Sequence, residues 1–123
     1  MTQIIRLEHE NSGDGLFRHQ DDFGKAIYRQ LNCFESLRDR YETFKTPYEE
    51  PLLKREMSEK YYCAFKSLDQ LSQWITSEEM MEILDYGFKI YVIDIEIYHE
   101  GEYQIIFKKE DIISKKDITD LFK

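Results

Sequence analysis

The sequence predicts an α+β fold, with a mainly antiparallel sheet of about four strands packed against one long helix and two to three short helices. Three observations predict it. Runs rich in β-branched and aromatic residues recur along the chain, apolar residues follow a helical spacing over residues 24–44, and helix-start signals precede two further apolar stretches. A chain of 123 residues suits one core and is short for two, so we expect a single domain over residues 1–123.

The first expected strand covers residues 2–9. Ile5 and Leu7 are expected on one face of this strand, and Ile4 and Arg6 on the other, because side chains alternate along a strand. The strand is followed by a run of Asn, Ser, Gly and Asp residues, which favours a turn.

The long helix is expected over residues 24–44, where apolar residues recur every three or four positions. They form a stripe that needs a partner surface: Ile27, Leu31, Phe34, Leu37, Tyr41 and Phe44. Residues 45–60 contain both prolines and little apolar periodicity, so we expect a long connection there.

A short strand is expected at residues 61–65. A helix should then begin at Ser67, because Ser67 and Gln70 have the spacing of a capping box, in which each side chain binds the other residue's backbone amide. Trp74 lies on the apolar face of this helix, and we interpret it as a core residue. A second helix should begin at residues 76–79.

Gly87 fits the C-terminal end of that second helix, where a positive φ is often required. The strongest strand pattern follows at residues 88–97. A hairpin turn at residues 98–101 is expected to lead into a return strand over residues 102–109. The pattern at residues 114–122 predicts a short helix capped by its first residue, a serine.

The chain is acidic, with 25 acidic against 17 basic residues and a net charge of −8. This balance argues against direct nucleic-acid binding, which needs a basic surface to displace phosphate counterions, and against attraction to anionic membranes. An acidic surface is attracted to basic partners, including the nucleic-acid-binding grooves of other proteins. A second interpretation is that the acidity only keeps the chain soluble. The small basic end formed by Lys108–Lys109 and Lys115–Lys116 is interpreted as a solvated rim.

Cysteines and histidines give no sign of a metal site. Cys33 and Cys63 are isolated, which fits neither a paired metal motif nor a disulfide scaffold. His9, His19 and His99 lie in or beside turns, and we interpret them as surface imidazoles. With no leader-like start and no run of about 18 apolar residues, we expect a cytoplasmic protein, in the host cell's cytoplasm if it is encoded by a phage.

Arg6 is the first candidate binding residue. An arginine on a strand beside a glycine turn suits a phosphate or a carboxylate, because its guanidinium donates two parallel hydrogen bonds. The alternative is an exposed arginine paired with Glu8 or Glu10.

Several segments together resemble small phage- and prophage-encoded proteins. They include the pattern F-x-S-x-x-x-L-x-x-W-I within residues 63–75, the Gly-Phe pair at residues 87–88, and the Q-I-I-F segment at residues 104–107. Residues 5–8 and 13–17 fit the same group. The resemblance implies an origin in a mobile element and no particular reaction.

A second resemblance is to ADP-ribosyltransferase-like domains. The matching positions are Arg6, Ser67 and either Glu102 or Gln104. The resemblance implies that Arg6 holds the pyrophosphate of NAD, that Ser67 orients the substrate, and that Glu102 binds the ribose and stabilises an oxocarbenium-like centre. The sequence departs from the pattern at Gln104, since an amide supplies no negative charge, and Ser67 already has a role as a helix cap.

Two functions are therefore open, and a purely structural domain within a larger phage assembly is a third possibility. The favoured one is a phage-type accessory or counter-defence protein, without a cofactor, that binds a basic surface of a host nucleic-acid-processing or defence protein. Its expected contact residues are Asp39, Glu42, Glu49, Glu50, Glu56, Glu59 and Gln104. The alternative is an NAD-binding enzyme that uses Arg6, Ser67 and Glu102 as catalytic residues.

Overall fold

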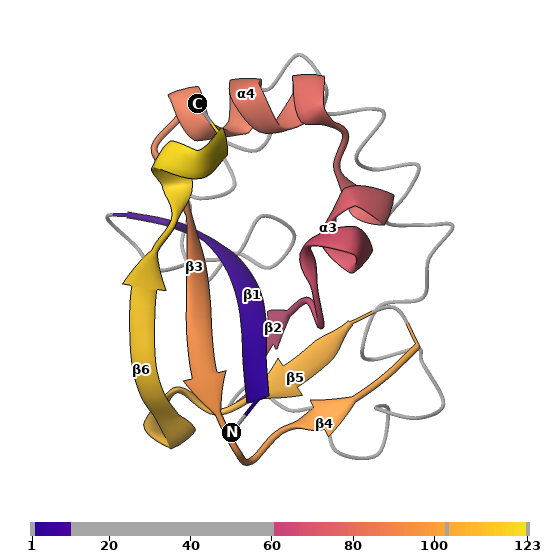
Figure 1. Ribbon diagram of the computed structural model, residues 1–123, viewed down its shortest axis with the longest axis vertical. Coiled ribbons are helices and arrows are strands. Elements are labelled where there is room, and N and C mark those ends of the chain that lie inside the picture. Colours follow the sequence, from indigo (N-terminus) through magenta and orange to yellow (C-terminus); the bar gives the residue numbers. More distant parts are fainter. Residues whose placement is uncertain (1, 11–60, 103, 123) are drawn as a thin grey trace.

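The computed structural model describes residues 2–10, 61–102 and 104–122 (Figure 1). Within them the chain forms six β-strands, two short α-helices and two 3-10 helices. In chain order these are β1 (Thr2–His9), β2 (Tyr62–Ala64), α3 (Leu68–Trp74), α4 (Ser77–Asp85), β3 (Phe88–Ile95), β4 (His99–Glu100), β5 (Ile105–Phe107), η1 (Lys109–Asp111), β6 (Ile112–Asp117) and η2 (Thr119–Phe122).

The strands form two antiparallel sheets of three strands each. The long sheet has the order β1-β3-β6, and the short sheet has the order β2-β5-β4. β1 and β3 pair along their whole length, from Thr2 opposite Ile95 to His9 opposite Phe88. β6 pairs with the other edge of β3, where the register shifts between Asp94 and Ile95.

The two sheets meet where β1 passes the end of β2. Ile5 and Phe65 exchange both backbone hydrogen bonds, with N–O distances of 2.8 and 2.7 Å. β1 therefore has backbone neighbours on both sides, and it is buried on both faces from Ile4 to His9. Residues buried on both faces are typical of a central strand.

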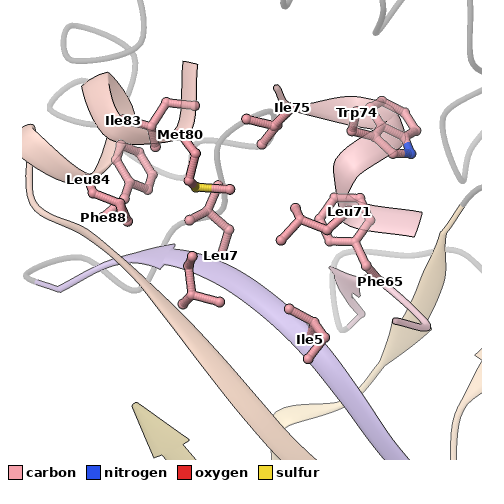
Figure 2. Packing of buried hydrophobic residues seen from close by; sticks show 11 residues of the cluster. Ile5, Leu7, Phe65, Leu71, Trp74, Ile75, Met80, Ile83, Leu84 and Phe88 are labelled. Carbon is pink, nitrogen blue, oxygen red and sulfur yellow. The ribbon is translucent and has the colours of Figure 1, made fainter. Parts of the chain in front are cut away.

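The larger core lies between the long sheet and the helices α3 and α4, which arch over one end of it in Figure 1. Figure 2 shows its side chains pointing toward one another from β1, the helices and the start of β3: Ile5, Leu7, Phe65, Leu71, Trp74, Ile75, Met80, Ile83, Leu84 and Phe88. Trp74 is fully buried, as the sequence predicts. Its ring centroid lies 6.1 Å from that of Phe65. A second cluster joins Ile4, Ile93 and Ile95 on the other face of the long sheet to the short sheet.

Both helices begin where the sequence predicts. Ser67 Oγ accepts a hydrogen bond from the Gln70 amide at 3.2 Å, while the Gln70 side chain accepts from the amide one residue before Ser67. At Thr76 the capping box is complete, because Thr76 and Glu79 each accept from the other's backbone amide. The predicted positive φ at Gly87 is also confirmed, at 94°.

The predicted arrangement of about four strands against one long helix was wrong. The described residues form two sheets of three strands, and the α-helices among them are two short ones. The segments predicted as a long helix and a long connection, residues 24–44 and 45–60, lie outside the described residues.

The strand predicted within residues 102–109 is present as β5, but the C-terminal prediction was wrong in two other respects. β3 does not pair with a return strand over residues 102–109; it pairs with β6, and the hairpin is formed by β4 and β5, with Gly101 N donating to Gln104 O at 2.9 Å. The helix predicted for residues 114–122 is instead the end of β6 followed by η2. The physical reason is that β3 has a second edge of backbone groups, and pairing with β6 satisfies them.

Candidate functional site

Arg6 lies on the face of β1 that points away from the helices, and it is 3% exposed. Its Nε donates to Glu8 Oε2 at 2.7 Å, and its Nη1 donates to the Cys63 carbonyl oxygen at 2.6 Å. The guanidinium carbon lies 5.3 Å from the ring centroid of Tyr62 and 5.7 Å from that of Phe107. The pair with Glu8 was anticipated, but the expected exposure was wrong.

Glu8 extends this contact across the long sheet. The Lys115 ammonium, on β6, donates to Glu8 Oε1, and it also lies 4.2 Å from the Tyr91 ring centroid. Burial acts to raise the pKa of Glu8, but the cations of Lys115 and Arg6 outweigh burial and hold this pKa below its ordinary value. The carboxylate is therefore ionised at neutral pH.

Tyr91 lies opposite Arg6 in the register of β1 and β3. Burial raises the pKa of Tyr91 above its ordinary value, and the negative charges of Glu8, Asp117 and Glu10 raise it further. The phenol therefore keeps its proton at neutral pH, so Tyr91 is no general base there.

The Arg6 cluster, meaning Arg6, Glu8 and Lys115, joins three strands. Arg6 and Glu8 belong to β1, Lys115 to β6, and the carbonyl that Arg6 binds belongs to Cys63 in β2. The buried charges of Arg6 and Glu8 touch each other, and Glu8 also touches the exposed Lys115. Pairing with opposite charges is how proteins accommodate buried ones. An external phosphate at Arg6 would compete with Glu8, so the geometry is suited to holding the sheets together.

Gln70, at the start of α3, binds both Ser67 and the backbone of Glu102. The Gln70 amide donates to Ser67 Oγ, and Gln70 Nε2 donates to the Glu102 carbonyl oxygen at 3.3 Å. The Glu102 side chain is exposed, whereas Gln104 is buried in the β4–β5 hairpin. Arg6 contacts different residues, on β1, β2 and β5.

The six acidic residues of the expected contact set, Asp39, Glu42, Glu49, Glu50, Glu56 and Glu59, lie outside the described residues. The described residues nevertheless contain 15 acidic and 7 basic residues, a difference of −8, which equals the net charge of the whole chain. The chain's excess of negative charge therefore belongs to the part that the structure describes.

Much of this charge lies on the two α-helices. Residues 67–88 contain no lysine or arginine and five acidic residues, namely Asp69, Glu78, Glu79, Glu82 and Asp85. Glu79 is committed to the capping box, and the side chains of Asp69, Glu78 and Asp85 are exposed. The sequence prediction missed this group, although a stretch of 22 residues without a basic side chain was a visible signal.

Basic side chains lie at the edge formed by β6 and the segment before it. Lys109 lies 4.4 Å from the ring centroid of Tyr62, and Lys115 makes the corresponding contact with Tyr91. Lys109, Lys115 and Lys116 are exposed, as expected of a rim, but two of them also cover aromatic rings.

His9 was expected at the surface, and this was wrong. It is 3% exposed, its Nε2 lies 2.9 Å from the Tyr86 carbonyl oxygen, and its ring meets that of Phe88 edge-on at 5.2 Å. Across residues 2–10, 61–102 and 104–122, no group of three His, Cys, Asp or Glu side chains is placed to hold a metal ion. None of the helices in these ranges is long and apolar enough to cross a membrane.

Comparison with known families decides the origin of the chain. Residues 1–119 match the family described as bacteriophage T4 Y00F protein. The chain belongs to this family. It is therefore a small phage-encoded protein, and the phage resemblance of its sequence is confirmed at that level. Neither the curated proteins nor the solved structures contain a match, so the similarity to ADP-ribosyltransferase-like domains stays a prediction.

Proposed function

We propose that the protein is a phage accessory protein that counters a host nucleic-acid-processing or defence protein by binding its basic surface. The observation that carries the proposal is the placement of charge. The described residues hold an excess of eight negative charges. The two α-helices lie between Lys66 and Lys89, and the chain contains no basic residue in that interval.

Such a charge distribution suits competition with nucleic acid. A protein that binds DNA or RNA presents lysines and arginines along a groove, and an acidic partner is drawn to that groove by the same long-range field. Complementary charges mainly raise the association rate and the specificity, while apolar contacts at the centre of the interface supply much of the affinity.

An NAD-binding enzyme is the second candidate. One observation favours it: Gln70 binds both Ser67 Oγ and the backbone carbonyl oxygen of Glu102, which keeps these two residues near the start of α3. Against it, the guanidinium of Arg6 is buried among Glu8, Cys63 and two rings. Calorimetric titration with NAD tests it, because saturable binding that is lost in Glu102→Gln would favour the enzyme, and no binding at roughly millimolar NAD would remove it.

The binding function is tested by affinity capture from a bacterial lysate treated with nuclease. We expect a nucleic-acid-binding or defence protein to be retained at about 0.05 M salt and released at about 0.5 M salt, because salt screens charges exposed at an interface. The purified partner should then lose affinity for its own nucleic acid when this protein is added. A partner retained equally at both salt concentrations, or one whose nucleic-acid binding is unchanged, would contradict the proposal.

A further inference from the structure

We propose that the outward face of α4, together with η2, is the surface that contacts the partner, and that it receives a basic segment which also carries apolar side chains. This surface is called the α4–η2 face below. The inference rests on the proposed function and names the place and the chemistry of the contact.

The outward side of α4 has a regular composition. Glu78, Met81, Glu82 and Asp85 follow the spacing i, i+3, i+4 and i+7, so they share one side of the helix. The opposite side is buried in the core and consists of Met80, Ile83 and Leu84 together with the capping residue Glu79. Met81, among the three acidic residues, is 63% exposed.

η2, at the C-terminal end of the chain, lies beside α4 (Figure 1). Ile118 N donates to Ile90 O at 2.8 Å, and the Thr119 hydroxyl accepts from Ile90 N at 3.0 Å, which ties the segment to β3. Leu121 nevertheless points outward, with 78% exposure, and Asp120 is also exposed.

The α4–η2 face therefore combines two exposed apolar side chains with four carboxylates, those of Glu78, Glu82, Asp85 and Asp120. Among the described residues, neither Glu78 nor Asp85 takes part in a salt bridge. An apolar centre with a polar rim is the usual composition of a protein interface.

Charge decides which partner this face fits. Carboxylates around Met81 and Leu121 attract lysine and arginine side chains and repel nucleic acid and anionic lipid. The helix is also held in place before binding, because its start is fixed by a complete capping box and its inner side by the buried Ile83. A surface that is already ordered loses little entropy on association.

The test is a nuclear magnetic resonance titration of the full chain with a synthetic amphipathic peptide built from lysine and leucine. We expect the largest amide shifts in α4 and η2. The variant Glu78→Gln/Asp85→Asn should bind the peptide about three- to tenfold more weakly, since it removes the charges of two exposed ion pairs, each of which is weak by itself. Met81→Ser should weaken binding without changing its dependence on salt.

The matched control is Glu96→Gln/Glu110→Gln, which removes the same charge from exposed positions outside the α4–η2 face and should bind as the parent chain does. Equal weakening by both double variants, or shifts centred on the sheets, would overturn the inference and leave the proposed function standing. Shifts in α4 that depend on protein concentration without peptide would assign the face to a second copy and overturn it as well. No binding of the peptide, together with no partner captured from lysate, would overturn both.

Discussion

The two faces of β1 are both buried, but by different chemistry. The face toward α3 and α4 places Ile5 and Leu7 among hydrocarbon side chains. The opposite face places Arg6 and Glu8 in a network with Lys115, backed by aromatic rings. One strand thus shows how a buried apolar surface differs from a buried ionic one.

The two faces differ in how much stability the fold loses when one side chain is removed. Apolar burial is non-directional and contributes roughly 25 cal/mol per Å² of buried area, so each side chain contributes in proportion to its size. A buried ion network depends on every partner, because removing one leaves a charge uncompensated, whereas replacing the whole group by apolar residues is often nearly neutral. We therefore expect graded losses on the first face and strongly non-additive ones on the second.

The largest effect is expected on the apolar face. Trp74→Ala removes a fully buried indole and should lower the free energy of unfolding by about 3–5 kcal/mol, because a cavity remains where the ring was. Urea denaturation measures the change. Leu68→Ala, on the same helix but 45% exposed, is the control and should cost much less. Equal losses for the two variants would contradict the assignment of Trp74 to the core.

On the ionic face, Glu8→Gln should lower the free energy of unfolding by about 3 kcal/mol, since Arg6 then stays buried without its counter-charge. The double variant Arg6→Met/Glu8→Leu should be more stable than Glu8→Gln, because it removes the uncompensated charge. Urea denaturation of the parent chain, Glu8→Gln, Arg6→Met and the double variant provides the comparison. If the double variant loses the sum of the losses of Glu8→Gln and Arg6→Met, the losses on the ionic face are additive and the expected difference between the two faces of β1 is absent.

The lowered pKa of Glu8 gives the ionic face a dependence on pH. A carboxyl group with a lower pKa in the folded state stabilises the fold above its unfolded pKa, close to 4.5, and loses that contribution as the pH falls toward the folded value. The parent chain should therefore lose stability below about pH 4.5, and Glu8→Gln should lose less over the same range. Denaturation midpoints between pH 3 and pH 7 measure this difference; parallel curves for both proteins would exclude Glu8 as its source.

The smallest effect is expected at Gly87, next to the buried His9. Its φ of 94° disfavours other residues, and a Cβ atom there would lie 2.9 Å from His9 Nε2. Gly87→Ala should therefore cost about 1–2 kcal/mol, mostly from the backbone conformation. Combining it with His9→Ala, measured by thermal unfolding, separates the causes: if His9→Ala abolishes the cost, the close approach was responsible and the backbone was not.

Local signals in the sequence predicted the helix starts, because Ser67 and Thr76 act on amides within three residues of themselves. The alternation along residues 2–9 likewise predicted which side chains of β1 share a face. The pair of Arg6 and Glu8 was also within reach, since residues two apart in a strand lie on the same side. The contact of Lys115 with Glu8 could not be predicted, because the two residues lie 107 positions apart and no local pattern connects them.

The sequence by itself determined local features: the acidic balance, the strand and helix starts, the core position of Trp74, and the likeness to phage proteins. Only the tertiary structure decided that β3 pairs with β6, that His9 is buried, and that η2 lies beside α4. The physical reason is the distance along the chain over which each interaction acts. Capping and alternation act within a few residues, whereas strand partners and burial depend on which distant segments satisfy the same backbone groups and cover the same side chains.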